Sequence, residues 1–344
     1  MNSEGQRTKP TVDPLSKDDQ SVGASLNPKP RVPQLSTTLA TFSNDPVDWP
    51  RILDIARASD RAGIDRLLVS DHVVFGEQLE DYARPELGGK LGGQQPTGPD
   101  GHWLEPITVL AALASATTRV RLGTNILLAA LRRPVVLAKS LATLDVISNG
   151  RIDLGVGVGW QSAEYEAAGL PFKQRGQYLD HTLGVLSALW SEPAVSVHDD
   201  LLDFDGIHAM PKPVQAGGVP IWVSGRVNRR VARRLARFGS GWIPWGEAAS
   251  DLVPAIAEMR ELVAAEGGDL DSCQVAGNVA RVATSSGGID LDATMSAVPR
   301  LVAAGVTDLR ISLPMHSDMG MTESGFVEAV EAFRAVTASS ESST

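Results

Sequence analysis

Short apolar runs alternate with helical patterns along nearly the whole chain, and this alternation restricts the fold more than any other feature. Eight runs have the length and composition of strands, and helical spacing follows most of them. Alternation of this kind implies a parallel sheet, and eight repeats predict closure into an α/β fold of the (β/α)8 TIM barrel type. An open doubly wound sheet is the alternative, which the strand count disfavours. The strands are expected within residues 35–42, 65–70, 120–127, 151–160, 220–224, 241–244, 274–284 and 308–313.

The segments between these runs carry the helices. In the first, Ile52, Ile55 and Ala56 recur on one face, and Gly63 ends the helix. The helices are expected over residues 48–62, 105–117, 133–147, 164–169, 174–190, 228–238, 251–266, 291–304 and 324–336.

The domain boundaries follow from composition. Residues 1–33 are rich in Pro, Ser, Asp and Lys with few large apolar residues, which predicts a disordered tail. Residues 34–340 are expected to form a single barrel domain with loop insertions at 76–104 and 192–218. The first insertion contains many Gly and Pro residues, and a loop of this length inside a compact domain is usually functional, often a lid.

Charge and composition exclude several functional classes. The chain has 344 residues, 43% of them hydrophobic, and a formal net charge of −10, which argues against a nucleic-acid or anionic-membrane surface. No run is long enough to span a membrane and no signal peptide is recognisable, so we expect a soluble cytoplasmic protein. Cys273 is the single cysteine, which excludes an internal disulfide and a cysteine metal cluster.

A ladder of alternate glycines stands out in Arg151–Trp160, RIDLGVGVGW. Gly155, Gly157 and Gly159 remove the side chains from one face of a strand, so something approaches that face closely. That neighbour is either another layer of the fold or a ligand. Trp160, which ends the ladder, is suited to line a pocket.

In a barrel the functional residues follow the carboxyl ends of the strands. Asp71 and His72, after the second strand, form either a general base, a metal site or a structural hydrogen-bonded pair. A metal site is disfavoured, because no His-x-His and no second cluster at ligand spacing is present. The candidate site residues are Ser70, Asp71, His72, Thr124, Asn125, Gly157, Gly159, Trp160, Ser224, Gly225 and Arg226.

Ser224, Gly225 and Arg226 lie just before an arginine-rich helix. Free backbone N–H groups and the helix dipole at such a place suit a phosphate group. The alternative is a solvated arginine face, which we expect for some of the arginines at 229–237.

Six blocks in this order resemble the luciferase-like monooxygenase superfamily, over roughly residues 35–340. They are SDH at Ser70–His72, LGTNILLAALRRP at Leu122–Pro134, LATLDVISNGRIDLGVGVGW at Leu141–Trp160, AEYEAAG at Ala163–Gly169, PIWVSG at Pro220–Gly225 and RLARFGSGW at Arg234–Trp242. The SDH form, with the LGTNILL and DVISNGR blocks, looks more like the branch that uses the deazaflavin F420 for hydride transfer.

The resemblance implies a barrel with an insertion and a flavin-type cofactor at the carboxyl ends of the strands. Asp71 and His72 would lie beside the cofactor ring. His72 would handle a proton or contact the ring, and Asp71 would orient His72 or contact the ring. Thr124 would lie at a non-proline cis bond, and the residues matching Ser224–Arg226 would hold the cofactor phosphate. Family members are often dimers, so a homodimer is expected.

One position departs from the family pattern. The sugar-phosphate dehydrogenases of the F420 branch carry an acidic residue just after the glycine ladder, where this chain has Trp160. This argues against a glucose-6-phosphate-type substrate. Trp103, Trp160 and Trp245, together with the long loop, suggest an apolar or aromatic pocket.

The sequence therefore predicts a flavin- or deazaflavin-dependent oxidoreductase acting on a small organic substrate. F420 is the expected cofactor and FMN the alternative. The rival functions are a reduced-FMN-dependent monooxygenase resembling alkanesulfonate monooxygenases, and a non-catalytic flavin-binding barrel.

Overall fold

The computed structural model describes residues 32–285 and 288–341. The disordered tail predicted for residues 1–33 therefore lies outside the described residues, except for its last two positions. Among the described residues, no helix is both long and apolar enough to cross a membrane.

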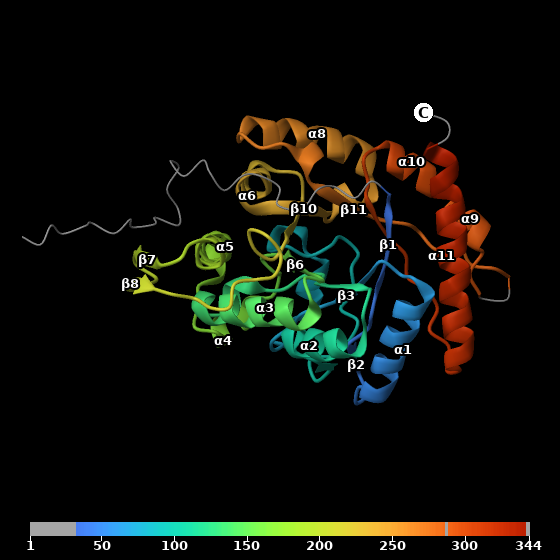
Figure 1. The fold of residues 1–344 in the computed structure, drawn as a ribbon, viewed down its shortest axis with the longest axis horizontal. Helices are drawn as coiled ribbons and strands as arrows, with labels where there is room; N and C mark the ends of the chain where they lie inside the picture. Colours follow the sequence, from blue (N-terminus) through green and yellow to red (C-terminus); the bar gives the residue numbers. More distant parts are fainter. Residues whose placement is uncertain (1–31, 286–287, 342–344) are drawn as a thin grey trace, which may run out of the picture.

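Eight parallel strands form a closed barrel at the centre of the molecule (Figure 1). β1 pairs with β3 on one side and with β12 on the other, so the sheet has no free edge. The predicted TIM barrel is confirmed, and the open doubly wound alternative is wrong. The barrel strands are β1 (Gln34–Thr38), β3 (Arg66–Val69), β5 (Arg121–Thr124), β6 (Ile152–Val156), β9 (Ile221–Gly225), β10 (Gly239–Pro244), β11 (Gln274–Asn278) and β12 (Asp308–Arg310).

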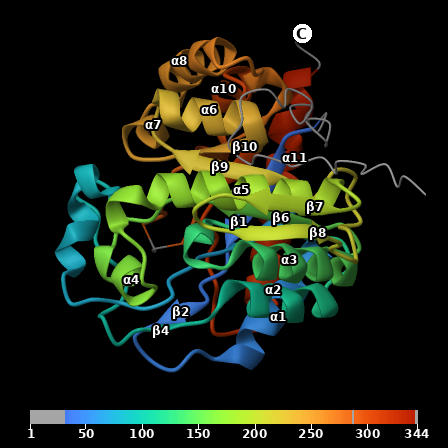
Figure 2. The same ribbon diagram turned by 90° about the vertical axis from the view of Figure 1, so that its left-hand side faces the viewer.

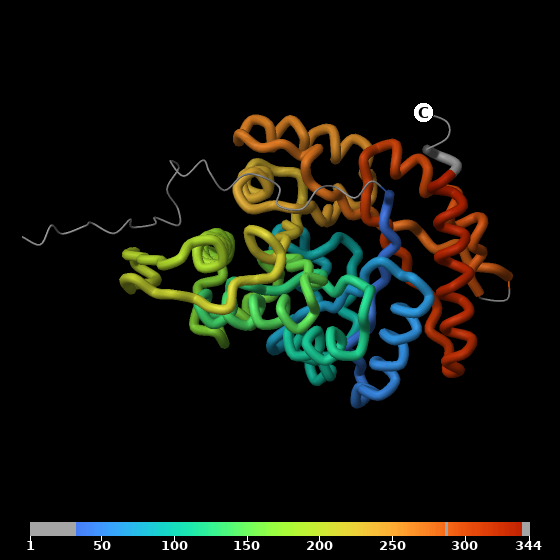
Figure 3. The backbone as a smooth tube through the Cα atoms, in the orientation of Figure 1, coloured from blue at the N-terminus to red at the C-terminus, as the bar shows by residue number. Residues whose placement is uncertain are grey.

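Helices surround the barrel, as the two perpendicular views show (Figures 1 and 2). The first and the last helix pack against each other, which joins the two ends of the ring (Figure 3). The helices are α1 (Trp49–Ala62), α2 (Pro106–Ala116), α3 (Pro134–Ser148), α4 (Ser162–Ala167), α5 (Arg175–Ser191), α6 (Arg229–Phe238), α7 (Glu247–Ser250), α8 (Leu252–Ala265), α9 (Leu291–Met295), α10 (Val298–Ala303) and α11 (Met319–Glu341).

Helix α1 illustrates how local sequence sets the element boundaries. The Asp48 side chain accepts a hydrogen bond from the Arg51 N–H at 3.2 Å and caps the first turn, where Pro50 fits without losing a helical hydrogen bond. Ile52 and Ile55 are buried on the inner face. Gly63 adopts the left-handed conformation at φ 88° and ends the helix, as predicted.

Several strands are shorter than predicted, because the chain leaves the barrel at their carboxyl ends, and after β5 and β6 it forms loops of the site. The strands expected over 120–127, 151–160 and 274–284 end at Thr124, Val156 and Asn278. The helix expected over 291–304 is divided into α9 and α10.

Both predicted insertions contain small elements of their own. The run expected over 35–42 is divided, and its end, β2 (Phe42–Ser43), pairs antiparallel with β4 (His102–Trp103) of the first insertion. That insertion also contains the short 3-10 helices η1 (Leu79–Ala83) and η2 (Pro85–Leu87). The second insertion forms the antiparallel pair β7 (Val195–His198) and β8 (Asp203–Ile207).

The barrel interior holds a buried ion network. The Arg66 guanidinium contacts the Asp153 carboxylate at 2.8 Å and the Asp308 carboxylate at 2.5 Å, and Arg310 contacts Asp308 at 2.8 Å. Burial alone would raise the pKa of Asp153, but the charges of Arg121 and Arg66 outweigh it and lower this pKa to about 2. The network links strands on opposite sides of the barrel.

Candidate active site

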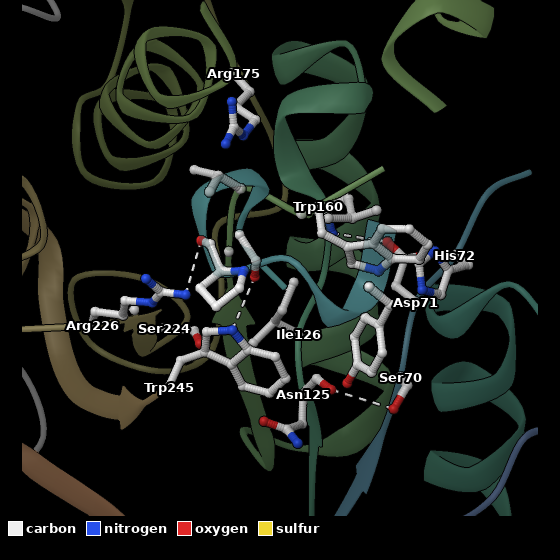
Figure 4. A pocket seen from close by; sticks show the side chains of 18 of the residues that line it. Ser70, Asp71, His72, Asn125, Ile126, Trp160, Arg175, Ser224, Arg226 and Trp245 are labelled. Atoms are coloured by element: carbon white, nitrogen blue, oxygen red, sulfur yellow. Dashed lines mark hydrogen bonds between the residues drawn. The ribbon is translucent and has the colours of Figure 1, made fainter. Parts of the chain in front are cut away.

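The carboxyl ends of five neighbouring strands, β10, β9, β6, β5 and β3, surround a cavity of about 480 Å³ (Figure 4). This volume is typical of sites for small molecules and cofactors. All the predicted site residues except Thr124 line the cavity. The lining residues are Phe42, Ser70, Asp71, His72, Tyr82, Pro85, Glu86, Gly88, Gln95, Pro96, Trp103, Asn125, Ile126, Leu128, Gly157, Val158, Gly159, Trp160, Arg175, Ser224, Gly225, Arg226, Asn228, Val231, Arg234 and Trp245.

Thr124 is turned into the barrel wall instead. Its side chain is buried, and its hydroxyl donates a hydrogen bond to the Gly155 carbonyl at 2.7 Å. The expected non-proline cis peptide bond is present, but it joins Asn125 to Ile126, one residue after the predicted position. Asn125 and Ile126 are therefore the residues of this segment that face the cavity.

The glycine ladder makes room for the segment that follows β5. A Cβ atom at Gly155 would collide with the Thr124 carbonyl, and one at Gly157 would lie 2.9 Å from Cδ1 of Ile126. A Cβ atom at Gly159 would lie 2.7 Å from Cδ2 of Leu128. The close neighbour is thus another part of the fold, although Gly157 and Gly159 also line the cavity.

His72 lies at one end of the cavity, beside a carboxylate that the sequence reasoning missed. Its Nδ1 atom is 3.1 Å from Oε2 of Glu164 in α4, without the alignment of a hydrogen bond. The Glu164 side chain is completely buried, and its other oxygen accepts a hydrogen bond from the Val73 N–H at 2.8 Å. Glu164 lies in the AEYEAAG block, but nothing in that block indicates that it approaches His72.

Asp71 does not orient His72, contrary to one of the predicted roles. Its carboxylate accepts hydrogen bonds from Arg132 at 2.6 and 3.1 Å and from the Leu128 N–H at 2.9 Å. Successive residues of an extended segment point in opposite directions, so neighbours in sequence need not meet. Burial alone would lower the pKa of Arg132, but the hydrogen bond to Asp71 outweighs it and raises this pKa. Asp71 is therefore paired with Arg132, which also contacts Glu105 at 3.0 Å.

Aromatic rings enclose the His72 end. The His72 ring lies 4.8 Å from Trp103 and 5.9 Å from Trp160, measured between ring centroids. Tyr82 lies 5.4 Å from Trp160 and 6.4 Å from Trp245, and burial raises the pKa of the Tyr82 phenol. Trp103 and Tyr82 belong to the 76–104 insertion, so this insertion forms a wall of the cavity.

Long side chains from the barrel fasten this insertion in place. Arg226 donates to the Pro85 and Gly89 carbonyls at 2.8 and 3.2 Å. The Trp245 indole donates to the Gly88 carbonyl at 3.0 Å, and Arg175 donates to the Leu87 carbonyl at 3.1 Å. Figure 4 shows one of the Arg226 bonds and the Trp245 bond. Arg226, predicted as a phosphate ligand, is thus also an anchor of the loop.

The end of the cavity opposite His72 is cationic. Figure 4 shows Arg175 and Arg226 on the side away from His72, and Arg234 lines the cavity as well. Burial lowers the pKa of the Arg175 guanidinium. In the arginine-rich helix Arg229, Arg230 and Arg233 are exposed, as predicted for part of its arginines, whereas Arg234 is buried and pairs with Asp180.

The N-terminus of α6 adjoins this cationic end. Asn228 caps the helix, and its side chain accepts hydrogen bonds from the Arg230 and Val231 N–H groups. Ser224 and Gly225, at the end of β9, line the cavity just before this turn. Among the described residues, no group of three or more His, Cys, Asp or Glu side chains is placed to hold a metal ion.

A family model described as luciferase-like monooxygenase matches residues 32–286. The chain belongs to the luciferase-like monooxygenase family. An uncharacterised protein of Mycobacterium tuberculosis is 36% identical over 140 residues, or 41% of this chain and 49% of that protein. The match thus spans about half the length of that relative.

Two further relatives of this luciferase-like protein carry functional names. An F420-dependent glucose-6-phosphate dehydrogenase of Nocardia farcinica is 30% identical over 222 residues, covering 60% of this chain and 58% of that protein. The oxygenase component of a flavin-dependent trigonelline monooxygenase of Acinetobacter baylyi is 35% identical over 123 residues, covering 35% and 34%.

Solved structures share the fold of this luciferase-like barrel. An F420-dependent secondary alcohol dehydrogenase in complex with an F420–acetone adduct superimposes with a TM-score of 0.66 at 19% identity, covering 88% of this chain and 99% of the other. The oxygenating constituent of 3,6-diketocamphane monooxygenase from Pseudomonas putida, in complex with FMN, superimposes with a TM-score of 0.64 at 15% identity, covering 88% and 98%.

Proposed function

We propose that this luciferase-like protein binds the deazaflavin F420 in the cavity and transfers a hydride between F420 and a small organic substrate. The observation that carries the proposal is the two-ended cavity, with arginines at one end and His72 among aromatic rings at the other. A flavin-type cofactor has a phosphate on a flexible chain at one end and a flat ring at the other. The Nocardia relative, named as F420-dependent, supports this choice of cofactor.

The polar atoms of the cavity are consistent with such an occupant. The side-chain atoms Nε1 of Trp160, Nε2 of Gln95 and Nε of Arg175 are buried donors without a hydrogen-bond partner within the protein. Buried donors in proteins are normally paired. The carbonyl and phosphate oxygens of a flavin-type cofactor and of its substrate are acceptors, so the residues present fit the proposed group.

The cationic end would hold the phosphate. Ser224 and Gly225 lie before α6, where the helix dipole favours an anion. Arg226 and Arg175 lie at this end of the cavity (Figure 4), and Arg234 also lines the cavity. Arg226 would bind the phosphate while its other donors hold the 76–104 insertion against the barrel. Cofactor binding would therefore be coupled to the position of this insertion.

The floor of the cavity would support the ring. Asn125 and Ile126 lie there beside Gly157, and the Asn125 side chain accepts a hydrogen bond from Arg310 of the barrel network at 2.8 Å. The buried network therefore fixes a residue of the cavity floor. When bound, reduced F420 supplies the hydride for the substrate.

His72 would handle the proton that accompanies the hydride. It lies beside Glu164, whose carboxyl group limits the orientation of the ring. The rings of Trp103 and Trp160 shield His72, and its side chain is only 10% exposed. Reduction of a carbonyl substrate would place the hydride on carbon and the His72 proton on oxygen.

The alternative is a monooxygenase that uses reduced FMN and oxygen, as the name of the Acinetobacter relative indicates for that protein. The test is oxidation of reduced F420 by candidate substrates under nitrogen and under air. Hydride transfer predicts substrate-dependent oxidation at the same rate in both. Turnover with reduced FMN that requires oxygen would contradict the proposal, and binding without turnover would indicate the non-catalytic barrel.

A further inference from the structure

One buried donor of the cavity has no role in the proposed phosphate end. Trp160 is 5% exposed, lines the cavity, and its Nε1–H has no hydrogen-bond partner within the protein. Trp222 also has an unpaired Nε1–H, but it does not line the cavity, whereas four other tryptophans donate this hydrogen to an oxygen of the chain. They are Trp103, Trp190, Trp242 and Trp245. An unpaired donor at a cavity wall is suited to a ligand that brings its own acceptor.

The surroundings of Trp160 select for a flat apolar molecule. Its ring lies between His72 at 5.9 Å and Tyr82 at 5.4 Å, measured between centroids. Trp103 and Phe42 stack at 4.1 Å beside His72. Aromatic walls of this kind pack against planar apolar surfaces by stacked or edge-on contacts.

The charges at this end disfavour an anionic ligand. Asp71 is paired with Arg132, which it shares with Glu105, and Glu164 is buried next to His72. The arginines that line the cavity in the described part of the chain are Arg175, Arg226 and Arg234, and the first two lie away from His72 (Figure 4). An anion near Trp160 would lose its hydration without gaining an arginine partner.

We infer that the His72 end is a substrate subsite for a neutral, planar molecule whose carbonyl oxygen accepts a hydrogen bond from Nε1 of Trp160. This rests on the proposed function, in which the arginine end belongs to the cofactor. Trp160 is then a specificity residue, and it selects neutral carbonyl compounds in place of the phosphorylated substrates for which the cationic end would be needed.

Three probes of similar size test this subsite on the full chain without cofactor. Acetophenone carries the acceptor oxygen, α-methylstyrene replaces it by a methylene group, and benzoate carries a charge. Indole N–H resonances of the ¹⁵N-labelled protein report binding, and Trp160→Phe identifies the Trp160 signal. The native protein should bind acetophenone about three- to tenfold more tightly than α-methylstyrene, the range expected for one hydrogen bond. Benzoate should bind more weakly than acetophenone.

The variants separate the hydrogen bond from general packing. Trp160→Phe should lower the acetophenone to α-methylstyrene affinity ratio by at least about threefold, because the ring remains and only the donor is lost. Trp49→Phe, in α1 and outside the cavity lining, should leave the ratio unchanged. Equal binding of the two probes to the native protein, or a ratio that Trp160→Phe does not alter, would overturn the inference. If Trp160→Phe fails to fold, the comparison of acetophenone with α-methylstyrene on the native protein still decides the question.

A parallel titration with F420 and FMN distinguishes this inference from the proposed function. A Trp160 signal that responds to either cofactor but not to acetophenone would show that the donor serves the cofactor and would overturn the subsite. A Trp160-dependent preference for acetophenone without binding of either cofactor would support the subsite and reject the proposed function.

Discussion

The Nδ1 atom of His72 lies 3.1 Å from the Oε2 atom of Glu164, and both side chains are almost or completely buried. The two residues come from different parts of the barrel, the loop after β3 and helix α4. The contact gives His72 a carboxylate partner at the edge of the cavity, which Asp71 does not provide because it is bound to Arg132.

Glu164→Gln should reduce kcat by about tenfold or more, because His72 loses the carboxylate that lies 3.1 Å from its Nδ1 atom and positions the ring. The amide oxygen of the new side chain can still accept the Val73 N–H hydrogen bond, so the local fold is retained. Steady-state kinetics should show KM for the cofactor nearly unchanged, since Glu164 is remote from the arginine end. An unchanged kcat would assign Glu164 a structural role alone.

His72→Asn should lower kcat by about 10²- to 10⁴-fold, the usual contribution of a general acid or base. Cofactor affinity, measured separately by titration, should change little. Exposed His198 provides the matched control, because His198→Asn lies in β7 outside the cavity lining and should be near native. Equal activities of the two variants would remove His72 from the mechanism.

Arg226→Met should weaken F420 binding by about tenfold or more, since a charge-assisted hydrogen bond is lost. It should also accelerate tryptic cleavage after exposed Lys90, because the Pro85 and Gly89 carbonyls lose their anchor. Arg230→Met removes the same charge from an exposed position of α6 and is the control. It should bind F420 with native affinity. Native affinity in Arg226→Met would contradict the proposed phosphate end.

Gly157→Ala should destabilise the protein by roughly 1–3 kcal/mol, because the new Cβ would lie 2.9 Å from Ile126 Cδ1. Gly155→Ala should destabilise the protein more than Gly157→Ala does. Its new Cβ would meet the backbone carbonyl of Thr124, which cannot move aside as a side chain can. Denaturant midpoints measure both changes. If Gly157→Ala lowered the midpoint more than Gly155→Ala, packing against 124–128 would not explain the ladder.

Asp153→Asn should destabilise the protein by about 3–5 kcal/mol at neutral pH, because it removes the carboxylate shared by buried Arg66 and partly exposed Arg121 and leaves Arg66 with the Asp308 carboxylate alone. The Asp153 pKa is lowered from 3.8 to about 2, so its contribution to stability is complete above pH 3.8 and is lost as the pH falls towards 2. Unfolding midpoints measured across this window should fall less steeply for the variant. A slope equal to that of the native protein would exclude Asp153 as a source of the acid sensitivity.

The fold was predictable because strand and helix periodicity is local. The Ile52–Ile55 face and the Gly63 cap of α1 lie within one short segment, and eight repeats of such patterns define the barrel. The strand ends were less predictable. Where the chain leaves the barrel after Thr124 depends on its contact with Gly155 in the next strand, which no local pattern records.

The sequence could predict which residues follow the strand ends and line the site, but not the residues that these contact. The partners of those residues come from distant segments, such as Arg132 for Asp71, 61 positions away, and Pro85 for Arg226, 141 positions away. Residue types alone could not show that Asp71 and His72 face different partners, or that Trp160 has an unpaired donor. The homodimer and the cytoplasmic location stay predictions.

The central claim is that the two-ended cavity binds F420, and equilibrium titration tests it most directly. F420, oxidised FMN and reduced FMN would be added to the full chain, with quenching of tryptophan fluorescence as the readout, since Trp103, Trp160 and Trp245 line the cavity. The account predicts that F420 binds at least about tenfold more tightly than either form of FMN, a difference of about 1.4 kcal/mol. Tighter binding of reduced FMN, or binding of none of the three, would contradict it.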